Sequence, residues 1–138
     1  MTLLFTGATV FISFNLIKKL LAAGFKAKGI DNFNNYYIVY LKDFILKELF
    51  KFIDELNSKF YLEKASIKSN SKLENIFKIH EPNAAINLAA QAGVRYPLVN
   101  PIAYLKSNIV GLSNLIELSK KLNLKNFFSK LCKNFFFK

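Results

Sequence analysis

The segment LLFTGATVFIS, residues 3–13, decides the fold of this chain. Its first three residues are apolar and predict a short buried strand, which Thr6 and Gly7 end in a turn. Apolar residues then recur at helical spacing from Phe11 to Leu21, and Gly24 is well placed to end that helix. A strand, a glycine turn and a helix in this order make the first half of a βαβ unit.

The residues that follow complete the unit. Residues 25–30 predict a second strand, and Asp31 stands at its end. In dinucleotide-binding βαβ units an acid roughly 20 residues after the glycine turn accepts hydrogen bonds from a ribose and disfavours the 2′-phosphate of NADP. The turn alone, with one glycine, favours an ordinary strand–turn–helix without a ligand. Asp31 together with its following loop favours a cofactor site.

Strands and helices alternate along the rest of the chain. Further strands are predicted at 60–62, 84–88 and 127–128, and helices at 41–56, 73–79 and 101–122. This alternation predicts an α/β fold, a Rossmann-like doubly wound parallel sheet in the order 3-2-1-4-5 that is truncated after about the fifth strand. We expect an incomplete NAD(P)-binding domain over residues 1–128 and a degenerate tail over residues 129–138.

Length and composition allow one domain of 138 residues with ample apolar material for a core, since 52% of the residues are hydrophobic. Cys132 is the only cysteine, so an internal disulfide is excluded, no metal site is indicated, and a cytoplasmic location is expected.

The uncharged run from Met1 to Ile17 is shorter than the roughly 20 apolar residues of a spanning helix, and polar residues interrupt it. We therefore expect no membrane insertion.

The formal charge of +11 suggests a nucleic-acid partner, but its composition argues against one. Of the 20 basic residues all except Arg95 are lysines, whereas base readout and bidentate phosphate contacts favour arginine. The lysines are also scattered along the chain. We expect weak attraction to polyanions and no specific nucleic-acid binding.

Three stretches resemble known sequences. Residues 6–13, TGATVFIS, resemble the TGxxGFIG fingerprint of extended short-chain dehydrogenase/reductases. Residues 31–37, DNFNNYY, resemble the DNxNDYY loop of UDP-glucuronate 4-epimerases. Residues 87–96, NLAAQAGVRY, with the helix that begins at Pro101, resemble the NAD-dependent sugar-nucleotide epimerases, the UDP-glucuronate 4-epimerases in particular.

The resemblance implies NAD as cofactor and a UDP-sugar as substrate. It implies that NAD is bound by Gly7, Phe11, Ile12, Asp31, Asn32, Leu88, Ala89, Ala90 and Asn108. Asn108 would fix the backbone near the nicotinamide side, and Arg95 would face the anionic part of the substrate. A plain surface position is an equally good interpretation of Arg95.

Three departures from the family pattern predict weakened NAD binding. Val10 and Ser13 occupy positions where the family has glycine, and Ser66 replaces an aspartate expected near the adenine. Val10 brings two methyl groups to the place where backbone approaches phosphate. If this position needs a positive φ, the strain is on the order of 1–3 kcal/mol. Ser13 is expected to widen the contact between helix and strand.

The catalytic residues of the family are not expected in this chain. There, a tyrosine with a lysine four residues later takes the proton of the sugar hydroxyl, and this chain has no such pair. We expect the N-terminal part of an epimerase that is inactive alone. Two alternatives remain: a non-catalytic NAD- or partner-binding module, and one half of a split epimerase. The uncovered edge of the fifth strand and the apolar residues 135–137 predict marginal stability and self-association.

Overall fold

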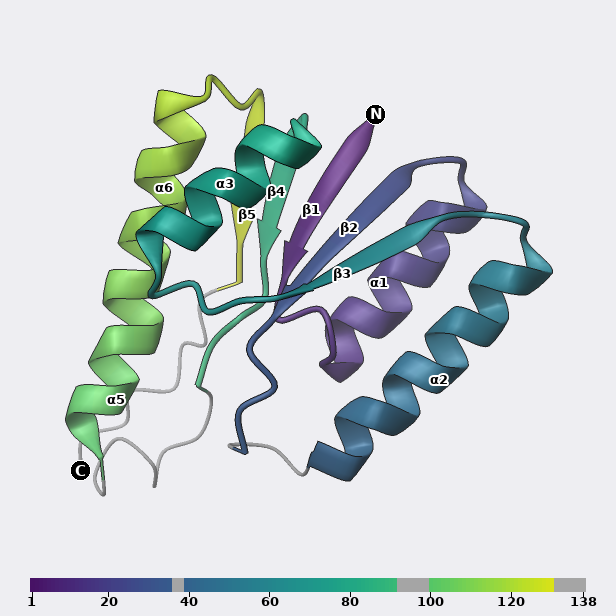
Figure 1. The fold of residues 1–138 in the computed structure, drawn as a ribbon, viewed down its shortest axis with the longest axis horizontal. Coiled ribbons are helices and arrows are strands. Elements are labelled where there is room, and N and C mark those ends of the chain that lie inside the picture. Colours follow the sequence, from purple (N-terminus) through teal and green to yellow (C-terminus); the bar gives the residue numbers. More distant parts are fainter. Residues whose placement is uncertain (36–38, 92–99, 131–138) are drawn as a thin grey trace.

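Five parallel strands form one sheet in the computed structural model, which describes residues 1–35, 39–91 and 100–130 (Figure 1). The strand order is β3-β2-β1-β4-β5, and all neighbouring strands run parallel. The strands are β1 (Thr2–Thr6), β2 (Lys26–Asp31), β3 (Phe60–Lys64), β4 (Ala84–Asn87) and β5 (Asn126–Ser129). The predicted Rossmann-like α/β fold and its strand order are confirmed.

Helices cover both faces of the sheet (Figure 1). They are α1 (Phe11–Ala22), α2 (Val39–Glu55), α3 (Asn70–His80), α5 (Pro101–Leu105), the π-helix η1 (Lys106–Val110) and α6 (Gly111–Lys121). The single helix predicted from Pro101 to about Leu122 therefore contains a π-helical stretch. Such stretches are rare and are often found at functional sites.

Side-chain alternation along β1 divides the core into two clusters, because successive strand residues point to opposite faces. Leu3 and Phe5 pack with Ile17 of α1 and Leu49 of α2 on one face. Leu4 packs on the other face, against α3 and α6, with Leu73, Phe77 and Leu115. Burial of both faces explains why the strands are short apolar runs.

The glycine turn after β1 lies against the turn after β4. Gly7 has a φ of +66°, and a Cβ at this position would lie 2.8 Å from the backbone nitrogen of Ala89 and 2.9 Å from the carbonyl carbon of Leu88. Only glycine fits this contact. The chain winds outward in opposite directions from β1 and β4, so their carboxyl ends form the switch point at which open α/β sheets bind ligands.

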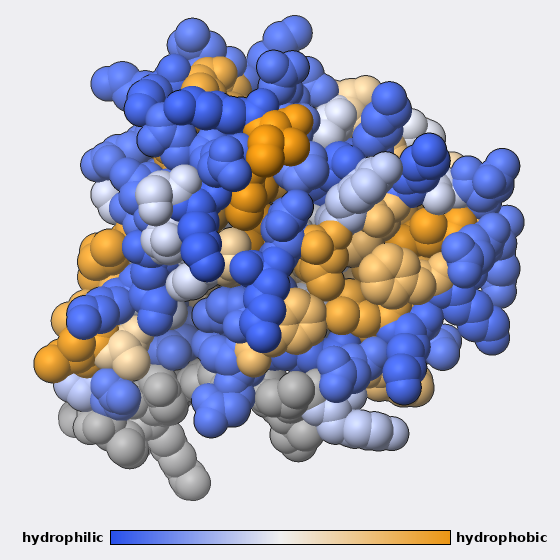
Figure 2. Space-filling model, viewed as in Figure 1, coloured by the Kyte–Doolittle hydropathy of each residue, from blue (hydrophilic) through white to orange (hydrophobic). Residues whose placement is uncertain are grey.

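Polar residues cover most of the face drawn in Figure 2, and apolar residues reach the surface near α5 and between β3 and α2. The exposed apolar side chains include Phe50, Tyr61, Ile102 and Leu105. Among the described residues, no helix combines the length and the apolar character needed to cross a membrane.

Candidate functional site

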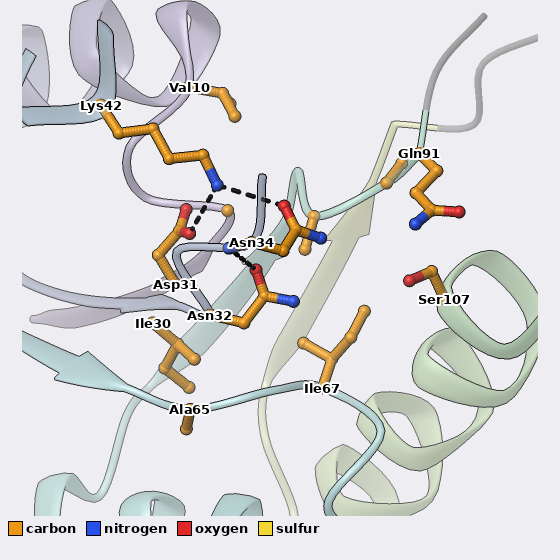
Figure 3. Close-up of a pocket in the computed structure, with 13 residues that line it drawn as sticks. Val10, Ile30, Asp31, Asn32, Asn34, Lys42, Ala65, Ile67, Gln91 and Ser107 are labelled. Atoms are coloured by element: carbon orange, nitrogen blue, oxygen red, sulfur yellow. Dashed lines mark hydrogen bonds and ion pairs between the residues drawn. The ribbon is translucent and has the colours of Figure 1, made fainter. Parts of the chain in front are cut away.

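A pocket of about 500 Å³, open to solvent, lies at the carboxyl ends of β1, β2 and β4 (Figure 3). The pocket is lined by Gly7, Val10, Ile30, Asp31, Asn32, Asn34, Lys42, Ala65, Ile67, Ala89, Ala90, Gln91 and Ser107. Five of the residues predicted to bind NAD are therefore neighbours in one pocket: Gly7, Asp31, Asn32, Ala89 and Ala90.

Asp31, at the end of β2, is buried and fully hydrogen-bonded by the chain itself. Its Oδ2 accepts from the backbone N–H of Thr9 at 3.1 Å and from the Thr9 hydroxyl at 2.7 Å. Its Oδ1 accepts from the backbone N–H of Phe33 at 2.9 Å and from Lys42 Nζ at 3.2 Å. An ionised carboxylate has about four acceptor positions, and these four donors occupy them.

Lys42 is a site residue that the sequence analysis did not identify. It lies in the first turn of α2, forms an ion pair with Asp31, and approaches Asn34 Oδ1 at 3.4 Å (Figure 3). Both charged side chains of the pair are only 4% exposed. Lysine is almost never buried without a partner. In the sequence Lys42 resembles an exposed lysine on a helix, so the apolar pattern of α2 did not indicate this contact.

Val10 is the N-cap of α1 and has an extended backbone, with φ −100° and ψ 158°. The strain expected for a positive φ therefore does not arise. Its side chain lines the pocket beside the beginning of α1, and within the described residues no side chain caps this helix N-terminus. The first N–H groups of α1 are then available to a ligand or to water.

Ser13 is fully buried, and its hydroxyl donates a hydrogen bond of 2.6 Å to the carbonyl oxygen of Gly7. The side chain links the first turn of α1 to the glycine turn. A glycine here would leave that carbonyl without this donor. The replacement therefore adds a contact that sequence reasoning did not anticipate.

A second, more apolar pocket lies on the other side of Val10 and Lys42. It is lined by Thr9, Val10, Phe11, Ile12, Leu41, Lys42, Ile45, Leu88, Ala90 and Lys130. Phe11, Ile12 and Leu88, which were predicted to bind NAD, lie here and not in the first pocket. The two pockets share Val10, Lys42 and Ala90, so all three are placed to affect a ligand that spans both.

Asn108, in the π-helix η1, holds the backbone that follows β4. Its Oδ1 accepts from the backbone N–H of Gln91 at 2.8 Å, and its Nδ2 donates to the carbonyl oxygen of Gln91 at 2.9 Å. Asn108 does not line either pocket. Its side chain thus fixes the backbone of Gln91, and its predicted position near the nicotinamide side stays a prediction.

Gln91 is a second residue of the pocket that received no role from the sequence. It is 7% exposed, and its Oε1 is buried with no hydrogen-bond partner among the described residues. Figure 3 shows its amide beside Ser107, across the pocket from Asp31. Ser107 is also buried.

The remaining predicted residues lie outside this geometry. Ser66 does not line the first pocket, and its Oγ accepts from the backbone N–H of Lys68 at 3.3 Å. Arg95, Cys132 and residues 135–137 lie outside the described residues. Their predicted roles stay predictions.

Comparison with known proteins agrees with this geometry. The sequence profile of the family described as GDP-mannose 4,6 dehydratase matches residues 4–135. The chain belongs to this family. It is 40% identical over 126 residues to Protein CapI of Staphylococcus aureus, and 42% identical over 122 residues to the UDP-glucuronate 4-epimerase of Thermodesulfobacterium geofontis. These matches cover 91% and 88% of this chain, but only 36% of each relative.

Solved structures show the same fold. A mutant of Bacillus cereus UDP-glucuronic acid 4-epimerase, in complex with NAD and UDP-4-deoxy-4-fluoro-glucuronic acid, is 30% identical with a TM-score of 0.79. The match covers 94% of this chain and 39% of that protein. The Bifidobacterium longum UDP-glucose 4-epimerase, in complex with NAD⁺ and UDP, has a TM-score of 0.81 at 21% identity, which supports the fold alone. The chain thus corresponds to the Rossmann-like part of these epimerases and spans about a third of their length.

Proposed function

We propose that this chain binds NAD as the Rossmann-like part of a UDP-glucuronate 4-epimerase-like protein. The observation that carries the proposal is the pocket at the switch point of the sheet, where Gly7, Asp31 and Ala89 meet although they are far apart in sequence. Relatives with this fold are solved with NAD bound. The uncapped N-terminus of α1 offers backbone N–H groups and a favourable dipole to the pyrophosphate.

The adenosine ribose would bind at Asp31, where the carboxylate already has four donors. A ribose hydroxyl therefore has to replace one of them. Lys42 is the most easily displaced, because its ammonium ends a flexible four-carbon chain, whereas two of the other donors are backbone N–H groups. NAD binding is thus proposed to exchange the Lys42 hydrogen bond to Asp31 for one from a ribose hydroxyl, while the ammonium stays close enough to remain the counter-charge of the carboxylate.

Val10 is proposed to weaken NAD binding, because its side chain lines both pockets beside the N-terminus of α1. Glycine is well tolerated at an N-cap, so the substitution Val10→Gly opens this space without loss of the helix. We expect Val10→Gly to bind NAD about tenfold more tightly, which corresponds to about 1.4 kcal/mol. Isothermal titration calorimetry measures this difference.

Asn15→Ala is the control, because Asn15 is exposed on the same helix and bonds only to the carbonyl oxygen of Phe11. Its NAD affinity is expected to equal that of the unaltered chain. Absence of measurable NAD binding in both the unaltered chain and Val10→Gly would overturn the proposed function.

Ser66 is proposed to weaken NAD binding further. Its hydroxyl accepts a hydrogen bond from the backbone of Lys68, and Ser66 does not line the pocket.

We propose that the chain does not epimerise UDP-glucuronate by itself, because its sequence contains no Tyr-x-x-x-Lys pair. Incubation of the isolated chain with NAD and UDP-glucuronate tests this directly. Formation of UDP-galacturonate would contradict the proposal.

Arg95 is proposed to face the uronate carboxylate of the substrate. Unchanged substrate binding by Arg95→Ala would contradict that role.

A second candidate function, a module that binds a partner chain, is favoured by the edge of the sheet. Among the described residues, β5 is the outermost strand next to β4, and its residue Phe128 is 56% exposed. Such an edge pairs readily with another strand. We propose self-association or binding of a second polypeptide here, and analytical ultracentrifugation over a range of concentrations distinguishes an associating chain from a monomer.

A further inference from the structure

One face of the sheet is bare where β2 and β3 begin. Leu4 points to the face that α3 and α6 cover, and Lys28 and Tyr61 follow it in register on β2 and β3. Register neighbours of parallel strands point to the same side, so Lys28 and Tyr61 belong to this face. Figure 1 shows α3 in front of β4 and β5, and within the described residues no helix lies in front of the beginning of β2 and β3. Because doubly wound sheets are ordinarily covered on both faces, this bare face is unusual.

Three lysines gather on the bare face. Lys26 lies two residues before Lys28 and points to the same side. Lys59 directly precedes Phe60, the register partner of Ala27, so its backbone lies beside that of Lys26. Like charges in such neighbouring positions of a sheet repel each other. Within the described part of the chain, none of the three lysines forms an ion pair with an acid.

Tyr61 presents an aromatic ring among these lysines. It is 48% exposed, and Lys28 Nζ lies 3.3 Å from the centroid of its ring. Burial and the charge of the neighbouring Lys26 lower the pKa of Lys28 from its ordinary value. Glu63 shares this face but approaches His80 Nε2, at 3.6 Å. The positive charges of the bare face therefore lack a counter-charge, and a bound anion would relieve their repulsion.

Ammonium groups around an exposed ring favour a nucleic acid over an acidic peptide. Lysine binds phosphate as a point charge, and every base has a flat face that stacks on an aromatic ring. An acidic peptide would meet the lysines, but its carboxylates gain nothing from the ring. In a duplex the faces of the bases are already stacked on one another, so only a single strand can place a base on Tyr61.

We propose that the bare face binds single-stranded nucleic acid without sequence preference, with phosphates at Lys26, Lys28 and Lys59 and a base stacked on Tyr61. Lys28 then leaves the ring and turns to a phosphate, a movement that its flexible four-carbon chain allows. Phosphate contacts carry no sequence information, so no preference among bases is expected. The bare face lies where the strands begin and the NAD pocket lies at their carboxyl ends, so this role is independent of the proposed function.

The first experiment measures binding of the full chain to a labelled oligothymidylate of about twelve nucleotides, by fluorescence anisotropy at several salt concentrations. For a single strand, each phosphate contact contributes about 0.7 to the slope of log K against log salt. The triple variant Lys26→Gln, Lys28→Gln, Lys59→Gln is therefore expected to reduce the slope by about 2. Its melting temperature should stay equal or rise, because like charges are removed. A lower value would contradict the repulsion on which the proposal rests.

The control variant Lys19→Gln, Lys47→Gln, Lys51→Gln removes the same net charge from exposed positions of α1 and α2. These helices cover the other face of the sheet. We expect the control to keep most of the salt dependence of the unaltered chain. An equal reduction in both triple variants would mean that the attraction follows net charge alone, and would overturn the proposal.

Tyr61→Leu tests the stacking of a base. It keeps an apolar side chain and removes the ring, so oligothymidylate should bind about tenfold more weakly. Inorganic polyphosphate has no base, and its affinity should not change. An equal effect on the two probes overturns the role of the ring. Polyglutamate and duplex DNA of the same length represent the other partners, and either one binding as tightly as the single strand overturns the proposal.

A second measurement needs no variant. Ultraviolet light crosslinks 4-thiothymidine in a single strand to the side chains that its base contacts, and mass spectrometry of the digested chain should find Tyr61 among them. Saturating NAD should leave this crosslink in place, since the NAD pocket lies at the other end of the strands. Crosslinks confined to residues that line the NAD pocket would overturn the proposal.

Discussion

The two walls of the pocket differ in whether their buried polar side chains have hydrogen-bond partners. At the end of β2, the Asp31 carboxylate accepts four hydrogen bonds from Thr9, Phe33 and Lys42. At the end of β4, the Gln91 backbone is held on both sides by Asn108, but its side-chain oxygen has no partner among the described residues. Within the described part of the chain, the polar side chain of one wall is fully paired and that of the other is not.

This difference predicts that the two walls contribute unequally to stability. Removal of one partner from a buried ion pair strongly destabilises a protein, so the Asp31 wall is expected to contribute most to the free energy of unfolding. A buried oxygen without a partner lowers stability, so the Gln91 wall is expected to contribute less to folding. The following changes test this division, beginning with the largest effect.

Lys42→Met is expected to have the largest effect, because it leaves the Asp31 carboxylate buried without its counter-charge. We expect a loss of about 3–5 kcal/mol in the free energy of unfolding, measured by urea denaturation. Lys47→Met, at an exposed position of the same helix, should change little. Recovery of part of the loss when Asp31→Asn is added would support the pairing, and a loss no larger than that of Lys47→Met would contradict it.

Gly7→Ala is expected to push the turn after β1 away from the turn after β4, which carries the Gln91 wall. The new methyl group would lie 2.8 Å from the backbone of Ala89, and the residue would keep a φ of +66°. Strain and overpacking together should cost about 2–4 kcal/mol. Gly24→Ala is the control, since Gly24 has a φ of +82° but nothing within 4 Å of its Cβ position. If both variants unfold at the same urea concentration, the close contact between Gly7 and Ala89 carries no cost.

Asn108→Ala is expected to loosen only the Gln91 wall. Two hydrogen bonds to the backbone of Gln91 are lost, and we expect a decrease of about 2 kcal/mol in the free energy of unfolding. Asn114→Ala removes a single hydrogen bond, to the carbonyl oxygen of Ile67, and should cost about half as much. Hydrogen exchange of the Gln91 amide, read by NMR, should increase in Asn108→Ala and not in Asn114→Ala.

Glu74→Gln should have the smallest effect and lies outside both walls. Hydrogen bonds from Lys121 and Lys78 lower the pKa of Glu74 from its ordinary value of 4.5 to about 2. Since the folded-state pKa is the lower one, this contribution to stability is present above about pH 4.5 and is lost as the pH falls towards 2. Chemical denaturation at several pH values should show a weaker acid dependence in Glu74→Gln, with NAD affinity unchanged. An identical pH profile in both proteins would refute the assignment.

Most of the fold was predictable because its signals are local. The apolar run before Gly7, the helical spacing from Phe11 and the acid at the end of β2 each act within a few residues, and all three elements form where they were expected. The π-helix η1 inside the predicted long helix was not foreseen. Its sequence has the ordinary helical pattern, so periodicity carried no sign of the extra residue per turn.

The candidate site was predictable only in part. Asp31, Gly7 and the alanines after β4 were found, because strand ends and small-residue turns are visible in the sequence. The lysine that neutralises Asp31 was not found, because Lys42 has the appearance of any helix-surface lysine. Gln91 stood inside the most informative stretch of the chain, yet nothing local showed that its side chain would be buried.

The amino-acid sequence by itself determined the order of the strands and helices, the turn at Gly7 and the acid at Asp31, since these depend on backbone preferences and on the period of apolar residues. Only the tertiary structure decided which groups meet. Thr6 donates a hydrogen bond to Asn87, which lies 81 positions later in the sequence. Gly7 lies against Ala89, which follows β4. Such contacts depend on how helices and strands pack in space, and no pattern within a short window specifies the partner of a buried polar group.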